Sequence, residues 1–159
     1  MITKWNAVRL GVAALLAFSA CVEEEPEPCP TYACGNQATL GGMLLLPPET
    51  SLLDVHFCFE DECEDGTIDL SDSPGFPCAD SNARSSVCAE EQNEAWIRLV
   101  ASWNHGQETE TSPPDGSSYS LRVTDAESGE LLLDETRAAT YEIVREDHCH
   151  RCWGADMSF

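Results

Sequence analysis

The densest group of reactive side chains is the run His148-Cys149-His150-Arg151-Cys152. Two cysteines separated by two residues, next to histidines, supply the N and S ligands that tetrahedral zinc prefers. A redox-active Cys-x-x-Cys pair is a further interpretation, although that motif normally occurs in a βαβ setting. Zinc and redox chemistry both need free thiols, which a cysteine-rich chain in an oxidising compartment is expected to lose. We therefore predict a structural Cys149–Cys152 disulfide, with zinc as the first alternative.

The acidic segment 60–65 contains five carboxylates and offers oxygen ligands to a cation. Read from Asp61, the sequence partly matches the EF-hand calcium loop, with Asp65 at the fifth position. Cys63 replaces the ligand of the third position, and Asp72 replaces the bidentate glutamate of the twelfth. We predict a solvated acidic turn, and weak calcium binding through Asp61, Asp65 and Asp72 is the alternative.

Motifs for catalysis are missing from the sequence, which has no Gly-x-Ser-x-Gly elbow, no His-Glu-x-x-His and no phosphate-binding glycine loop. We therefore expect a protein that is not an enzyme. A hydrolase built on paired carboxylates is an alternative, because the chain has 29 acidic residues whose separations are open. Trp96 is expected on the outward side of its strand, where it could stack on a sugar or contact a partner. His56 and His105 are expected to be surface histidines.

Residues 1–20 have the features of an export signal, with basic residues first and an apolar run before small residues. The apolar run is roughly ten residues long, which is too short to cross a bilayer as a helix. Ser19 and Ala20 precede Cys21, as in the lipobox, whose cysteine receives a diacylglycerol thioether and becomes the new N-terminus. Phe18 stands where a lipobox usually has leucine. We predict a signal peptide at 1–20 and a lipidated, palmitate-bearing Cys21, and the alternative is loss of Cys21 within a removed leader.

Residues 21–28 are expected to be an acidic tether, because their charges repel one another and their prolines lack amide donors. Without residues 1–20, six basic residues face 29 acidic ones, which is a formal net charge of −23. A field of that sign repels nucleic acid, and no nucleic-acid partner is expected. Residues 29–159 are sufficient for one domain of ordinary size.

This domain contains short strand patterns separated by turn residues, and no sustained apolar period of 3.6 residues. Leu53 to Phe59 alternates between apolar and polar residues, and Ala95 to Trp103 is the strongest segment of this kind. The other expected strands are 39–46, 67–70, 119–124, 131–133, 141–144 and 153–159, with a long loop over residues 71–86. The pattern predicts an all-β fold, an antiparallel β-sandwich of Ig-like or Greek-key type with disulfide-stapled loops.

The chain has nine cysteines, so that a lipidated Cys21 leaves eight to form four disulfides. Opposed residues of antiparallel strands have Cα atoms about 4.5–5.5 Å apart, which suits a disulfide across the hairpin from Cys58 to Cys63. Short spacing favours the sequential set among the roughly 105 possible pairings. The predicted disulfides are Cys29–Cys34, Cys58–Cys63, Cys78–Cys88 and Cys149–Cys152.

The whole chain resembles small lipoproteins of Gram-negative soil bacteria. The resemblance rests on Ser19-Ala20-Cys21, on the hairpin from Cys58 to Cys63, and on the element from Cys149 to Cys152 before a final strand. It implies a place in the cell envelope but no activity that can be transferred to a residue. Val22 is not the Asp of inner-membrane retention, which favours the outer membrane of a Gram-negative cell.

The expected function is that of a lipid-anchored, non-catalytic surface binding or structural module without a cofactor. Its expected partners are the bilayer, through Cys21, and an envelope or surface protein. The alternative is a module that binds calcium through the acidic turn or carbohydrate through Trp96.

Overall fold

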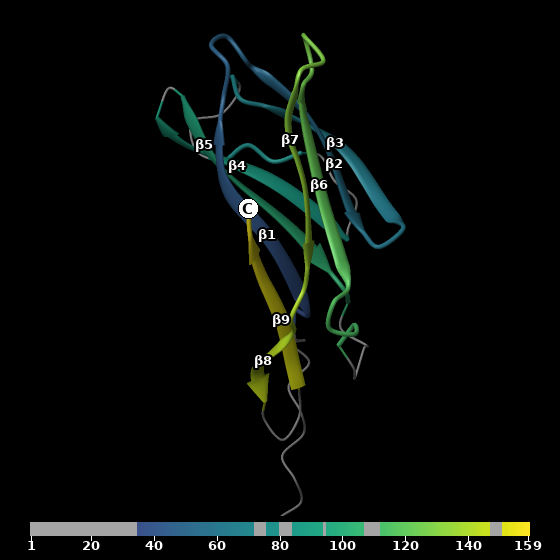
Figure 1. Ribbon diagram of the computed structural model, residues 1–159. Helices are drawn as coiled ribbons and strands as arrows, with labels where there is room; N and C mark the ends of the chain where they lie inside the picture. Colours follow the sequence, from purple (N-terminus) through teal and green to yellow (C-terminus); the bar gives the residue numbers. More distant parts are fainter. Residues whose placement is uncertain (1–34, 72–75, 80–83, 94, 107–111, 147–150) are drawn as a thin grey trace, which may run out of the picture.

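A computed structural model describes residues 35–71, 76–79, 84–93, 95–106, 112–146 and 151–159, which form two packed β-sheets (Figure 1). Their strands are β1 (Gln37–Leu45), β2 (Leu52–Phe59), β3 (Glu62–Asp69), β4 (Ser85–Asn93), β5 (Trp96–Asn104), β6 (Ser118–Asp125), β7 (Leu131–Ala138), β8 (Glu142–Glu146) and β9 (Arg151–Ser158). A helix with the length and apolarity to span a membrane is not found among these residues. The predicted all-β class and the arrangement as two packed sheets are confirmed.

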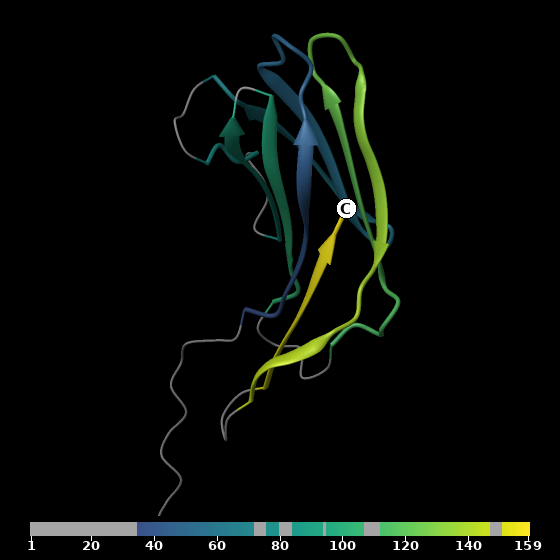
Figure 2. The same ribbon diagram turned by 60° about the vertical axis from the view of Figure 1, so that its left-hand side comes forward.

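The five-stranded sheet has the order β4-β5-β1-β9-β8, and the four-stranded sheet has the order β3-β2-β6-β7. Four antiparallel pairs join consecutive strands, namely β2–β3, β4–β5, β6–β7 and β8–β9. Strand β1 is different, because it pairs with β5 in antiparallel and with β9 in parallel orientation. The first and last strands therefore lie side by side within one sheet, as both views show (Figures 1 and 2).

The core lies between the sheets and follows from the alternation of side chains along each strand. Strand β2 buries Leu53, Val55 and Phe57, whereas Asp54 and His56 face outward. Strands β5 and β6 show the same alternation. Complete burial of one large apolar side chain contributes about 1.5–3 kcal/mol. The faces expected from the sequence for β2, β5 and β6 are thus the faces that build the core.

Aromatic rings connect the two sheets inside this core. The Phe57 ring meets Trp103 of the opposite sheet edge to face, with ring centroids 5.8 Å apart. Phe57 also stacks on Tyr119, whose centroid lies 6.3 Å away. Tyr119 is fully buried and is the largest side chain with that property among the described residues. The sheets are therefore held in a fixed relation by specific ring contacts as well as by apolar area.

The loop expected over residues 71–86 is wrong at its C-terminal end, because Ser85 and Ser86 begin β4. Strand β4 lacks a strong sequence signal, since its inward residues Val87 and Ala89 are small and most of its other residues are polar. Strand β4 is extended because it pairs with β5, the most apolar strand, and not because of a strand preference in its own sequence. The strands β3 and β7 are also longer than expected.

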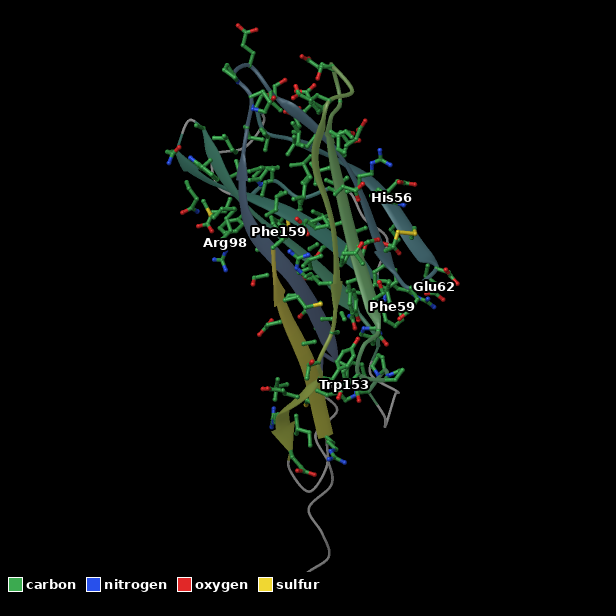
Figure 3. The ribbon with its side chains drawn as sticks, viewed as in Figure 1. His56, Phe59, Glu62, Arg98, Trp153 and Phe159 are labelled. Atoms are coloured by element: carbon green, nitrogen blue, oxygen red, sulfur yellow. A yellow bond between two sulfur atoms is a disulfide. The ribbon has the colours of Figure 1, made fainter. Side chains whose placement is uncertain are left out.

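A close backbone approach explains Gly42 in β1. A Cβ atom at this position would lie 2.6 Å from the ring of Phe159 and 2.8 Å from its carbonyl oxygen. The Phe159 amide donates to the Gly41 carbonyl at 3.2 Å, which holds the residue against β1 (Figure 3). The absence of a side chain at Gly42 therefore lets this ring pack onto β1.

The predicted Cys58–Cys63 and Cys78–Cys88 disulfides are both present. Cys152 is buried and also disulfide-bonded, and its partner lies outside the described residues because the other described cysteines are already paired. The predicted signal peptide (1–20), the predicted tether (21–28) with Cys21, and the cysteines Cys29, Cys34 and Cys149 lie outside the described residues.

Candidate functional site

A shallow cavity of about 650 Å³ lies on the outer face of the four-stranded sheet and is called the outer groove here. Its polar lining residues are Asp54, His56, Asp65, Thr67, Arg122 and Thr124. They come from β2, β3 and β6, where the outward positions of three neighbouring strands fall into line. The groove therefore offers hydrogen-bond donors and acceptors of both charge types on a rigid sheet.

One row of the groove carries ionisable side chains on four adjacent strands. His56 stands opposite Asp65 on one side and opposite Arg122 on the other, and Arg122 stands opposite Asp134 of β7. The Nδ1 atom of His56 lies 2.6 Å from the Oδ1 atom of Asp65. In the next row, the Thr67 hydroxyl donates to the Asp54 carboxylate at 3.0 Å. These contacts hold the side chains of the groove in defined positions.

The Cys58–Cys63 disulfide borders the same row, and its Cα atoms are 4.0 Å apart. Cys58 is 5% exposed although it is on the outer face, whereas Cys63 is exposed. The Nε2 atom of His56 lies 3.2 Å from the Cys58 sulfur. His56, Cys58 and Cys63 thus bring three groups of metal-binding type together, but the sulfur atoms are joined to each other. Figure 3 shows His56 beside the yellow disulfide.

The structure separates two of the residues proposed as calcium ligands. Asp61 lies in the turn between β2 and β3, and Asp65 follows four residues later in extended strand. An extended strand rises about 3.3 Å per residue, so that the three steps from Glu62 to Asp65 alone span roughly 10 Å. Asp65 is moreover engaged by His56, and Asp72 lies outside the described residues.

A cluster of five ring side chains closes one end of the sandwich and is called the end cluster here. It consists of Phe59, His105, Tyr119, Tyr141 and Trp153, which come from both sheets. The Tyr119 hydroxyl lies 2.5 Å from His105 Nε2 and 2.5 Å from the Tyr141 hydroxyl. Trp153 is buried, and its Nε1 atom has no hydrogen-bond partner among the described residues. Figure 3 places Phe59 and Trp153 at this end.

Burial sets the protonation of the end cluster. Desolvation lowers the pKa of His105 to about 4, although the charge of Glu62 opposes this shift. Desolvation also raises the pKa of Tyr119 and of Tyr141. At neutral pH the cluster is therefore uncharged. The expectation that His105 is a surface histidine is wrong, because its ring is half-buried against four aromatic rings.

An apolar patch lies on the outer face of the five-stranded sheet and is called the β1–β5 patch here. It consists of Met43, Leu45, Trp96 and Arg98, and the three apolar side chains are 46%, 54% and 40% exposed, respectively. Leu45 stands directly opposite Trp96, and Met43 stands opposite Arg98. The Arg98 guanidinium reaches the Glu90 carboxylate at 4.0 Å. The outward position expected for Trp96 is confirmed, and its cross-strand neighbours are the apolar Leu45 on β1 and the polar Asn93 on β4.

The pKa values of the described carboxyl groups bear on the hydrolase alternative. Asp69 and Asp125 are the described carboxyl groups with a resolved shift, and both have a lowered pKa. Hydrogen bonds from Ser71 cause the shift of Asp69, and hydrogen bonds led by the Ser128 amide cause that of Asp125. A general acid at neutral pH requires the opposite direction. These two groups serve turns rather than proton transfer.

Sequence reasoning identified Trp96 and the outer faces of β2 and β3, but it did not identify Arg122, Asp134 or the end cluster. The sequence places Arg122 on the outward side of its own strand. Its position beside His56 depends on the pairing of β2 with β6, which the sequence does not show. Comparisons with protein-family models, with curated proteins and with solved structures found no match.

Proposed function

We propose that this chain is an exported, outer-membrane lipoprotein, anchored through Cys21, whose β domain is a non-catalytic module that binds an envelope or surface protein. The β1–β5 patch is the observation that carries the proposal. Three large apolar side chains and one arginine form two adjacent cross-strand pairs on an outward sheet face. An exposed apolar cluster lowers solubility, and such clusters commonly mark sites where a protein partner binds. We therefore interpret the patch as the surface that a partner covers.

The composition of the patch favours a protein partner over a sugar. Trp, Met and Arg are enriched in the centres of protein interfaces, and Trp and Arg are the commonest hot-spot residues. Trp96 pairs with Leu45 on one side, and Met43 lies next to Leu45 on the same outward face, so that the exposed centre of the patch is apolar. The formal net charge of −21 disfavours a second copy of the same chain as the occupant. The partner proposed is therefore a protein with an apolar centre and a basic rim.

The position of the patch suits a lipid-anchored protein. Strand β1 begins at Gln37, next to the end cluster, and ends at Leu45 in the patch. Figure 2 shows β1 running along the sandwich from one end to the other. Eight steps of about 3.3 Å place the patch roughly 26 Å from the start of the strand. A membrane anchor before β1 would thus present the patch away from the bilayer.

Two further observations support parts of the proposal. The Cys58–Cys63, Cys78–Cys88 and Cys152 disulfides fit an oxidising compartment, which an export signal would provide.

The order of the strands supports a Greek-key topology. Each connection between successive hairpins crosses from one sheet to the other, and β6 lies beside β2 although β4 and β5 of the other sheet come between them in the sequence. On this basis we assign the sandwich to the Greek-key type, with immunoglobulin-like packing of the sheets.

The lipid anchor predicts a defined mature N-terminus. Mass spectrometry of the protein expressed from the full chain in a Gram-negative host is expected to show Cys21 as the first residue, with the added mass of a diacylglycerol thioether. A Cys21→Ala variant, which keeps the small residues before the cleavage site, is expected to lose membrane association. An unmodified Cys21, or a mature chain that starts beyond it, overturns the lipoprotein proposal but leaves the partner proposal standing.

The patch predicts loss of one partner when Trp96 is replaced. Truncation of an aromatic hot spot costs about 2 kcal/mol or more, which is roughly a 30-fold weaker complex. In crosslinking on intact cells, Trp96→Ala is expected to abolish a partner band that the wild-type chain forms. Leu131→Ala is the matched control, because Leu131 is 48% exposed on β7, away from the patch. A band that both variants keep, or that both lose, contradicts the assignment of the partner to this patch.

A further inference from the structure

The two cysteines of the Cys58–Cys63 disulfide differ in their exposure to solvent. Cys63 is exposed near the start of β3, whereas Cys58 on β2 is 5% exposed. Cys63 is therefore the more accessible of the two cysteines to a thiol in solution. Thiol–disulfide exchange requires access to the attacked sulfur, and the other sulfur becomes the leaving group. The structure thus defines Cys58 as the leaving thiolate.

A histidine is placed next to this leaving group. The Nε2 atom of His56 lies 3.2 Å from the Cys58 sulfur, and the Nδ1 atom lies 2.6 Å from the Asp65 carboxylate. The Asp65 carboxylate accepts a hydrogen bond from the Nδ1–H group of His56, which fixes the ring and places Nε2 beside the sulfur. A protonated imidazole beside a cysteine favours its thiolate. His56 is thus held where it can stabilise the negative charge that reduction creates.

We propose that Cys58, Cys63, His56 and Asp65 form a thiol–disulfide exchange site, which oxidises two thiols once per oxidised chain and so adds a stoichiometric, non-catalytic reaction to the binding of a partner. An external thiolate attacks the Cys63 sulfur and forms a mixed disulfide, and the electron pair of the broken S–S bond passes to Cys58. The Cys58 thiolate takes a proton from His56 Nε2 when the ring is in its imidazolium form, and the ring regains that proton from the solvent, which received it from the external thiol. A second thiol then attacks the external sulfur of the mixed disulfide and releases Cys63. Two external thiols are oxidised to one disulfide, and their protons and electrons reside on Cys58 and Cys63.

The surroundings of the site restrict the thiol that can react. Glu62 and Glu64 flank Cys63 in the sequence, and the chain as a whole carries a formal net charge of −21. Anionic thiols are therefore repelled, and uncharged or cationic thiols are the substrate class that suits the site. The outer groove next to His56 leaves room for the rest of such a molecule.

The second disulfide supplies an internal control. Cys78 is also exposed, and Cys78–Cys88 also joins a segment to the outer part of a sheet. The Cys78 sulfur contacts the Phe76 carbonyl oxygen at 3.7 Å, which cannot stabilise a neighbouring thiolate. Cys88 is half-buried whereas Cys58 is buried, so exposure alone predicts that Cys78–Cys88 is reduced at least as fast as Cys58–Cys63. The proposed site predicts the opposite order.

The test uses the oxidised mature chain and dithiothreitol as an uncharged probe. Samples are quenched by alkylation over time, and peptide mass mapping gives the reduction rate of each bridge. We expect Cys58–Cys63 to be reduced at least about tenfold faster than Cys78–Cys88, because a stabilised thiolate leaves faster. His56→Gln is expected to remove most of this advantage, and Asp65→Asn part of it, without a change at Cys78–Cys88.

Each outcome bears on the proposal. Equal rates for the two bridges in the wild-type chain overturn it. A fast Cys58–Cys63 bridge that is unaffected by His56→Gln also overturns it, because the histidine then does not cause the difference. A variant that loses its fold would accelerate both bridges together, and the proposal is then decided by Asp65→Asn, which keeps a hydrogen-bond acceptor at the same position.

Discussion

Replacement of Tyr119 by alanine is expected to remove about 3–5 kcal/mol from the free energy of unfolding, since a buried aromatic side chain is lost from the core. Tyr119 is 0% exposed, and its ring contacts Phe57, Phe59 and His105. Its removal opens a cavity that touches both sheets. A small domain is stable by about 5–15 kcal/mol in total, so this single change can bring the protein close to unfolding.

Two further variants separate the ring of Tyr119 from its hydroxyl group. Tyr119→Phe keeps the ring but leaves His105 Nε2 and the Tyr141 hydroxyl without the partner that they share. We expect a loss of about 1–3 kcal/mol, which is the cost of unpaired buried polar groups. Leu131→Ala on the exposed side of β7 should stay within about 0.5 kcal/mol of wild type. Urea unfolding followed by tryptophan fluorescence measures all three, and equal midpoints for Tyr119→Ala and Leu131→Ala would contradict the assigned core.

Acidification is expected to destabilise the protein through His105. Burial lowers its pKa from 6.5 to about 4 in the folded state. Between these values the unfolded chain binds more protons than the folded one, so that the contribution is complete above pH 6.5 and is lost as the pH falls towards 4. After a discount for the partial exposure of the ring, the loss is about 1–2 kcal/mol.

The control for this pH effect is His105→Gln, which has no charge to gain. Acidification also relieves repulsion within a chain of formal net charge −21, which acts in the opposite direction on both proteins. The informative quantity is therefore the difference between the two proteins in their change of unfolding free energy from pH 7 to pH 4.5. We expect wild type to lose about 1–2 kcal/mol more than the variant. Parallel curves would mean that His105 titrates normally in the folded protein.

Alternation of side chains was sufficient to predict most of the sandwich. Leu53 to Phe59 and Ala95 to Trp103 carry a period of two, and each forms a strand whose apolar side is buried. Strand β4 could not be predicted from alternation, because its extended conformation results from its pairing with β5. The parallel pairing of β1 with β9 has no local signal at all, since it joins residues such as Ala38 and Ala155.

The candidate sites also differ in how far the sequence predicts them, because some contacts lie within one hairpin and others join distant segments. The Cys58–Cys63 bridge was predictable because both residues belong to one hairpin, where spacing sets the register. The contact of His56 with Asp65 depends on that same register, although the sequence shows no sign that the ring turns towards the sulfur. The end cluster joins residues from distant segments, such as His105 and Trp153. No periodicity within one strand can place such residues together.

The pairing of the first strand with the last has a consequence for synthesis. A ribosome makes β1 early, and its β5 edge can be covered after some 60 residues, but its other edge must wait for β9. Thr39 and its hydrogen-bond partner Asp156 are 117 positions apart in the chain. Throughout that interval an unpaired strand edge is exposed, and such edges recruit other chains. One edge of β1 therefore stays open to other chains until β9 has docked, and the mutual repulsion of chains with a formal net charge of −21 opposes such association.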